Sequence, residues 1–190
     1  MKNVMIVGVG GQGTLLASRV LGNVAIKMGY DVKVSEVHGM SQRGGSVVTY
    51  VKYGEKVHSP LVSKGQADIL LAFEELEAYR WMPYLSKGGA LIVNTQQMDP
   101  MPVIIGAAQY PENILDKIKT KIGRVLALDA LKLALEAGTV KAVNVVLLGQ
   151  MAKNMEVGKE VWLEALKETV PPKFLDMNLK AFDLGYHYQA

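Results

Sequence analysis

The chain of 190 residues contains no cysteine. Disulfide bonds are therefore impossible, and this chain cannot hold an iron–sulfur cluster through its own thiolates. A zinc ion would have only His, Asp and Glu as ligands. The sequence has just three histidines, which are scattered at His38, His58 and His187. Because no spacing typical of a metal site occurs, we expect no metal to be bound by this chain.

The sequence also lacks a strong excess of charge and a long hydrophobic run. The net charge is +3 at pH 7, which is too small to indicate nucleic acid or an anionic membrane as the main partner. Apolar stretches such as 69–73 and 145–148 are far shorter than the roughly 20 residues that cross a bilayer. The N-terminus has no secretion signal. We therefore expect a cytoplasmic protein.

Short apolar runs alternate with helical stretches along the chain, of which 49% is hydrophobic. They predict strands at 4–7, 32–37, 46–53, 68–73, 90–94 and 125–128. They predict helices at 14–28, 74–85, 111–120, 130–137, 143–154 and 159–170, and an amphipathic segment at 174–184. Residues 95–111 are expected to be irregular and 185–190 to be a tail.

This alternation favours an α/β fold: one three-layer Rossmann-like domain over residues 1–190, with a mostly parallel sheet and C-terminal helices. A turn after the third predicted strand would let residues 56–59 return as a hairpin arm. The sheet is therefore expected to have an antiparallel edge.

A glycine-rich loop joins the first predicted strand to the first predicted helix. Its candidate binding residues are Gly8, Gly10, Gly11, Gln12 and Gly13. Glycines let the backbone turn tightly and approach a phosphate, and the helix N-terminus attracts an anion. Glu36 lies near the end of the second predicted strand, where a carboxylate would bind ribose in a dinucleotide fold. The alternative is that the glycines serve strand–helix packing only.

A second glycine-bearing loop follows the second predicted strand. Its candidate binding residues are Ser41, Gln42, Arg43 and Gly44. Loops at the carboxyl ends of strands line the crevice where ligands bind, so we expect both loops at one edge of the sheet. Arg43 could clamp a phosphate or carboxylate, with hydrogen bonds from Ser41 and Gln42. The alternative is that Arg43 is a surface or interface residue.

No catalytic set is predicted. No Ser/His/Asp arrangement can be assigned, and the sequence lacks a nucleophile elbow. Glu74, Glu75 and Glu77 open a helix, where acidic side chains favour the helix dipole. That role is a more ordinary explanation for them than paired-carboxylate catalysis.

Several stretches, in order along the chain, resemble the gamma-type domain of the 2-oxoacid:ferredoxin oxidoreductases. They are residues 10–14, 39–47, 59–62, 67–74, 77–80 and 144–149. The Ser-Gln-Arg-Gly-Gly form at 41–45 favours the branch that acts on indolepyruvate. After residue 149 we find little resemblance.

The resemblance implies the role of a small subunit without activity alone. The full enzyme decarboxylates an aryl 2-oxoacid, joins the acyl group to coenzyme A and passes electrons to ferredoxin. Thiamine diphosphate, Mg²⁺ and the iron–sulfur clusters are expected in a larger alpha subunit. The glycine loop and Arg43 are then expected to contact coenzyme A or the neighbouring subunit.

Two other functions stay open from the residues alone. The chain could be a free-standing NAD(P)-binding oxidoreductase that uses Gly8, Gly10, Gly13 and Glu36. It could also be a scaffold protein without a ligand. Titration of the isolated chain with NADH and with coenzyme A would separate the three possibilities.

Overall fold

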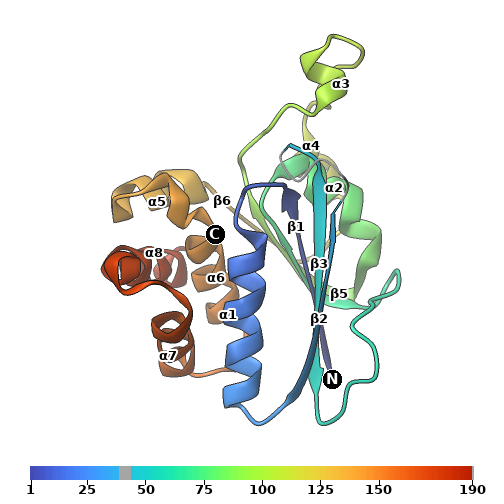
Figure 1. The fold of residues 1–190 in the computed structure, drawn as a ribbon. Helices are drawn as coiled ribbons and strands as arrows, with labels where there is room; N and C mark the ends of the chain where they lie inside the picture. Colours follow the sequence, from blue (N-terminus) through green and yellow to red (C-terminus); the bar gives the residue numbers. More distant parts are fainter. Residues whose placement is uncertain (39–43, 190) are drawn as a thin grey trace.

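The computed structural model describes residues 1–38 and 44–189, and its central element is a six-stranded sheet (Figure 1). The strands are β1 (Lys2–Val9), β2 (Asp31–His38), β3 (Ser46–Gly54), β4 (Ala67–Ala72), β5 (Leu85–Asn94) and β6 (Val125–Leu128). Their order across the sheet is β2-β3-β1-β4-β5-β6. β1, β4, β5 and β6 pair in parallel, whereas β3 is antiparallel to β1 and β2. The predicted mostly parallel sheet with an antiparallel edge is confirmed.

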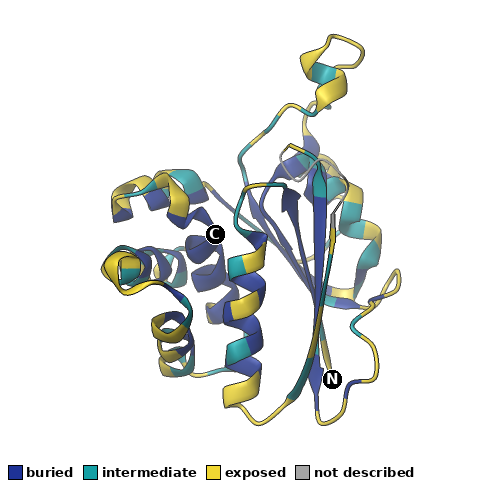
Figure 2. Cartoon of the chain, viewed as in Figure 1, coloured by how far each residue is buried: buried dark blue, intermediate teal, exposed yellow. Residues whose placement is uncertain are grey.

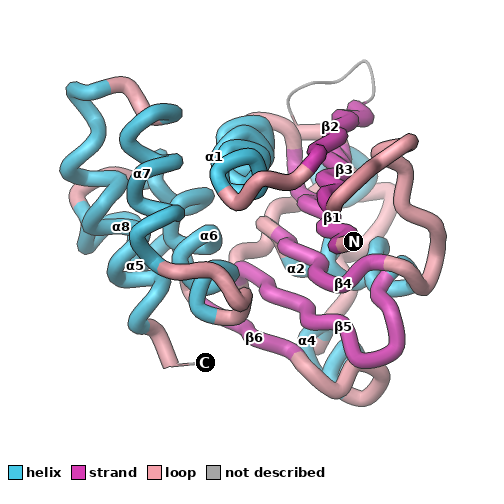
Figure 3. The backbone as a smooth tube through the Cα atoms, turned by 90° about the horizontal axis from the view of Figure 1, so that it is seen from below, coloured by secondary structure: helices cyan, strands magenta, loops and turns pink. Residues whose placement is uncertain are grey.

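Helices cover both faces of this sheet. The α-helices of the described residues are α1 (Thr14–Lys27), α2 (Glu75–Trp81), α3 (Met101–Ile104), α4 (Ile114–Lys119), α5 (Ala130–Ala137), α6 (Val143–Lys153), α7 (Lys159–Thr169) and α8 (Leu175–His187), and all but α3 flank the sheet. α1 and the C-terminal helices lie on one side, and α2 and α4 lie on the other (Figure 3). Within the described part of the chain, no helix has the length and apolarity to cross a membrane.

The central strands contribute side chains to a buried cluster on each face of the sheet. In β1, Val4 and Ile6 join the cluster under α1 and α6, while Met5 and Val7 join the cluster under α2 and α4. A strand covered on both sides is apolar at successive positions, which is why β1 shows a continuous hydrophobic run. The first cluster extends outward to Trp162 of α7 and Phe182 of α8.

Several predicted boundaries are wrong; the helix predicted to start at residue 111, for example, starts at Ile114. Residues 56–59 form no strand, because the Val57 N–H donates to the Asp31 carboxylate (2.8 Å) and the hairpin partner of β3 is β2. The helix predicted at 74–85 ends at Trp81, since Pro83 follows in a short 3₁₀ turn and Leu85 already belongs to β5. The predicted tail is partly helical, because α8 continues through Gly185 to His187.

Residues 95–111, which we call the arm, project beyond the carboxyl end of β5. The sequence predicts this segment to be irregular, but it carries the short helix α3 at its tip (Figure 1). The tip is coloured almost entirely as exposed, in contrast to the buried strands beneath it (Figure 2).

Candidate functional site

The glycine loop connects β1 to α1, and its glycines are fitted closely to neighbouring side chains. A β-carbon at Gly8 would lie 2.7 Å from Gln12 Oε1 and 2.9 Å from the β-carbon of Phe73. A β-carbon at Gly13 would lie 2.6 Å from Asn144 Nδ2, and Gly13 also has a φ of 86°. Packing against Phe73 therefore requires glycine at position 8, and the left-handed backbone favours it at position 13, whatever the loop binds.

Gln12 turns its side chain into the protein. Its Oε1 accepts a hydrogen bond from the Val9 N–H (2.8 Å), and its Nε2 donates to the Phe73 carbonyl (3.1 Å). Asn94, at the end of β5, donates to the same carbonyl (3.1 Å) and accepts from the Ala130 N–H (3.1 Å). The Gln12 amide thus ties β1 to β4 and does not reach outward as a predicted ligand contact would.

The two predicted loops meet at the carboxyl edge of the sheet. The Gly10 N–H donates to the Gly45 carbonyl (2.9 Å), and the Gly44 N–H donates to the Gly10 carbonyl (3.4 Å). The prediction that both loops leave one edge is confirmed. The candidate residues Ser41, Gln42 and Arg43 lie outside the described residues.

Two backbone N–H groups of the glycine loop are already used in internal hydrogen bonds. The N–H groups of Gly10 and Gln12 already bond to Gly45 and Val9, so these donors are occupied. Gly11, in contrast, is exposed with a φ of 101°, and no atom of residues 1–38 or 44–189 lies within 4 Å of a β-carbon placed there. The turn at Gly11 and the amino end of α1 are therefore what this loop presents to a ligand or a neighbouring subunit.

Glu36 does not take the place of a ribose-binding carboxylate. It lies on the edge strand β2, opposite Thr49 of β3, and β3 separates β2 from β1. Adjacent strands lie about 4.8 Å apart, so β2 is roughly 10 Å from β1 instead of directly beside it. A dinucleotide-binding fold has the carboxylate on the strand next to the first. The geometry does not support the NAD(P) interpretation.

Three carboxylates at the start of α2 are buried, although the sequence predicts them only as residues that favour the helix dipole. Glu74 caps α2 by accepting from the Glu77 N–H (2.8 Å). Glu77 accepts from Ser46 Oγ (2.5 Å), from Arg80 (2.7 Å) and from the Trp81 indole (3.2 Å). Its charge is therefore balanced by an ion pair.

Glu75 and Tyr110 have shifted acidities in this cluster. Burial raises the pKa of Glu75, a hydrogen bond from Gln97 Nε2 (2.9 Å) opposes that shift, and the neighbouring Glu74 charge adds to it. Burial also raises the pKa of Tyr110, and its hydrogen bond to Glu74 raises it further. In this pair the Tyr110 hydroxyl is the donor and the Glu74 carboxylate the acceptor.

The two cavities described below lie away from the glycine loop. Over residues 1–38 and 44–189, no group of three His, Asp or Glu side chains is placed to bind a metal ion. A cavity of about 410 Å³ lies at the amino ends of β1 and β4, and a groove of about 660 Å³ runs between α1 and β2. Neither is lined by residues 8–13.

Sequence reasoning missed two buried asparagines that shape the site. Asn144, near the start of α6, donates to the Gly13 carbonyl (3.2 Å), and Asn94 joins the ends of β4 and β5 to α5. Asn94 directly follows an apolar run, and Asn144 is the single polar residue within another. A buried amide must find hydrogen-bond partners, and that is the signal that could have marked them.

Comparison with known proteins gives one consistent family. The family model described as pyruvate ferredoxin/flavodoxin oxidoreductase matches residues 3–188. Indolepyruvate oxidoreductase subunit IorB of Pyrococcus horikoshii is 47% identical, with 96% of this chain and 93% of that protein covered. The same subunit of Thermococcus kodakarensis is 45% identical over the same shares.

A solved structure of similar fold is the gamma subunit of a keto/oxoacid ferredoxin oxidoreductase from Geobacter sulfurreducens. Its TM-score is 0.72 at 26% identity, and the match covers 98% of this chain and 96% of that one. The six-stranded sheet and its surrounding helices are thus the fold of a complete subunit in that protein.

Proposed function

Because the chain belongs to the pyruvate ferredoxin/flavodoxin oxidoreductase family, we propose that it is the small subunit of an indolepyruvate:ferredoxin oxidoreductase. The observation that carries this proposal is the 47% identity to subunit IorB over 96% of the chain. In the proposed reaction an aryl 2-oxoacid loses its carboxylate as CO₂. The acyl group forms a thioester with coenzyme A, and the released electrons pass to ferredoxin.

The proposed division of labour puts the cofactor chemistry on a larger subunit. Thiamine diphosphate, Mg²⁺ and iron–sulfur clusters would be bound there, and ferredoxin would take its electrons from that assembly. The absence of cysteine supports this division, because the chain has no thiolate to ligate a cluster.

The part proposed for this chain is to complete the assembly at the carboxyl edge of its sheet. The exposed turn at Gly11 and the amino end of α1 would face coenzyme A or the larger subunit. The contribution of Ser41, Gln42, Arg43 and Gly44 to the same contact stays a prediction from the sequence. So do the organisation of residues 1–190 as one domain and the cytoplasmic location.

The function is tested by producing this chain with and without the larger subunit. Thioester formation is measured with indolepyruvate, pyruvate and 2-oxoglutarate, with coenzyme A and ferredoxin present. We expect turnover only in the two-subunit sample, with indolepyruvate as the preferred acid. Turnover by this chain alone, or a clear preference for pyruvate, would contradict the proposal.

The role of Arg43 is tested in the same holoenzyme. Arg43→Ala is expected to raise the KM for coenzyme A while the KM for the oxoacid is unchanged. Arg19→Ala is the matched control, because Arg19 is an exposed arginine on α1 that lines the groove beside β2. An unchanged KM for coenzyme A would argue that Arg43 makes no direct contact with it.

A further inference from the structure

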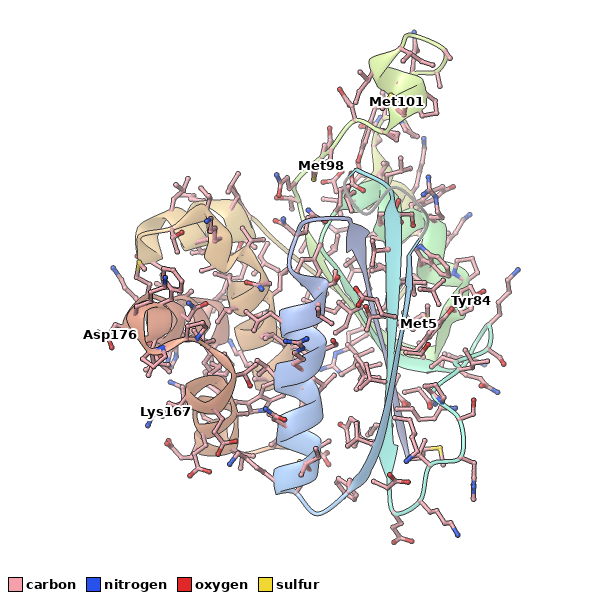
Figure 4. The ribbon with its side chains drawn as sticks, viewed as in Figure 1. Met5, Tyr84, Met98, Met101, Lys167 and Asp176 are labelled. Atoms are coloured by element: carbon pink, nitrogen blue, oxygen red, sulfur yellow. The ribbon has the colours of Figure 1, made fainter. Side chains whose placement is uncertain are left out.

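The tip of the arm exposes large apolar side chains that contact little of this chain. Met101, Ile104 and Ile105 are 63%, 65% and 68% exposed. Figure 4 places Met98 along the leg of the arm and Met101 at its end, well away from the sheet. Residues 100–111 include no charged side chain. An exposed apolar patch of this kind marks a surface that another molecule covers.

The tip is preformed by its own hydrogen bonds. The N–H groups of Ala107 and Ala108 both donate to the Pro102 carbonyl (2.8 and 3.0 Å), which closes the turn after α3. The Ile104 N–H donates to the Pro100 carbonyl (3.1 Å). Two prolines restrict the backbone at the start of the helix. The apolar tip therefore already has a defined backbone conformation, so a partner that binds it would not have to offset the entropic cost of ordering it.

The base of the arm is fastened on both legs by buried carboxylates. Glu74 accepts from the Met98 N–H on the outgoing leg (3.2 Å) and from the Tyr110 hydroxyl on the returning leg. Glu75 accepts from Gln97 Nε2 (2.9 Å), and its own N–H donates to the Gln96 carbonyl (3.2 Å). These two carboxylates are 1% and 5% exposed. Both legs of the arm are thus hydrogen bonded at their base to the first residues of α2 and its cap.

We propose that the tip of the arm, Met101, Ile104 and Ile105, is an anchor that inserts into an uncharged apolar pocket of the larger subunit. This inference rests on the proposed function, which supplies that subunit. The absence of charge along residues 100–111 sets the chemistry of the pocket, because a buried charge opposite the tip would be unpaired.

The position of the arm selects the larger subunit over a second copy of this chain. The arm leaves the carboxyl end of β5, and the glycine loop leaves the carboxyl end of β1 at the same edge of the sheet. A subunit whose active site is completed by that edge meets the arm as it docks. A second copy that received the arm in its α1–β2 groove is the competing occupant, and the test below distinguishes it from the larger subunit.

The test compares variants within the two-subunit enzyme. Ile104→Asp/Ile105→Asp places two charges on the tip, and Leu135→Asp is the matched control on α5, where Leu135 is 57% exposed. The dissociation constant between this chain and the larger subunit is measured by biolayer interferometry. Circular dichroism and thermal unfolding of each isolated variant show whether it is folded. All three side chains are exposed, so we expect folded proteins.

We expect the double variant to weaken association by at least about 30-fold, the size of a typical interface hot spot. Leu135→Asp should bind within about twofold of the wild type. Equal affinities of the wild type and the double variant would overturn the inference and leave the proposed function standing. Failure of the wild type to bind the larger subunit would overturn both. An isolated wild-type dimer that the double variant abolishes would identify a second copy as the occupant, against the proposal.

Discussion

Two glycines of the β1–α1 loop, Gly11 and Gly13, differ in why a larger residue would be unfavourable there. Gly11 and Gly13 both have positive φ angles, 101° and 86°. A β-carbon at Gly11 would meet no atom of the described residues, whereas one at Gly13 would press on the Asn144 amide. The backbone cost is therefore common to both positions, and the steric cost belongs to Gly13 alone.

This difference can be measured. Gly11→Ala should lower the free energy of unfolding by about 1–2 kcal/mol, the cost of a left-handed residue with a β-carbon. Gly13→Ala should lose about 1–3 kcal/mol more through overpacking. Urea denaturation of both variants gives the comparison. In the Asn144→Ala background the gap should shrink, and a gap that persists there would show that Asn144 is not the cause.

Glu75 is a buried carboxylate that hydrogen bonds to an amide but has no ion pair in the described structure. Because burial raises its pKa above the ordinary value of 4.5, the native state binds this proton more tightly than the unfolded chain. Stability from this group therefore falls as the pH rises past 4.5, and the cost is fully present once Glu75 is ionised in the native state.

Glu75→Gln should accordingly stabilise the protein at pH 7, by about 1 kcal/mol. The glutamine carbonyl can still accept from Gln97, so that hydrogen bond is kept. Thermal unfolding at a series of pH values should show the advantage over wild type disappearing below pH 4.5. The exposed Glu112→Gln is the control, and an advantage for Glu75→Gln that did not vary with pH would refute the argument.

At the scale of elements, α6 and α8 are packed so closely that their glycines touch the opposite backbone. A β-carbon at Gly185 of α8 would lie 2.8 Å from the Val146 carbonyl carbon, and closer still to its oxygen. Gly149 of α6 meets the backbone of α8 in the same way, 2.8 Å from the Tyr186 nitrogen. A methyl group at either position must separate the two helices.

Replacement by alanine is therefore expected to have opposite effects on stability at two helical glycines, Gly185 and Gly22. Gly185→Ala should cost about 3 kcal/mol or more, because it forces backbone apart. Gly22→Ala in α1 should be neutral or stabilising by up to about 1 kcal/mol, since its nearest neighbour is Val32 at 4.0 Å and alanine favours helix. Thermal unfolding distinguishes them. A mild effect of Gly185→Ala would mean that α8 can shift away from α6 at little cost.

Gly185 also explains why the helix at the end of the chain is longer than the sequence predicts. Glycine after a helical pattern usually marks a helix end, so residues 185–190 are expected from sequence to be a tail. At Gly185 the residue instead permits helix–helix contact, which depends on Val146, almost 40 positions earlier. By contrast, β6 and α5 are confirmed at the predicted residues, since their signals are local: an apolar run, the Asp129 cap and Gly138.

At the scale of the whole molecule, the alternation of strands and helices is enough to predict the fold class and the edge where the two loops meet. It does not reveal strand order. Because β3 lies between β1 and β2, Glu36 is too far from β1 to serve as a ribose-binding residue. This strand order depends on the pairing of β1 with β3, which are distant in sequence. Nor does sequence spacing show that Gln12 points inward, because that depends on the Phe73 carbonyl at the end of β4.

The arm gives a prediction for the assembled enzyme. In the isolated chain its tip is exposed and joined to the body only at the base, so a protease that cleaves beside large apolar residues, such as thermolysin, should nick it between residues 100 and 108. Trypsin should leave the arm intact, because no Lys or Arg occurs from 88 to 116. Bound to the larger subunit, the tip is covered, and thermolysin cleavage should slow by at least tenfold while tryptic cleavage at the exposed Lys167 of α7 continues. Mass spectrometry of the fragments identifies the sites. Equal rates of nicking in the free chain and in the complex would place the arm in solvent, and its apolar tip would then need another explanation.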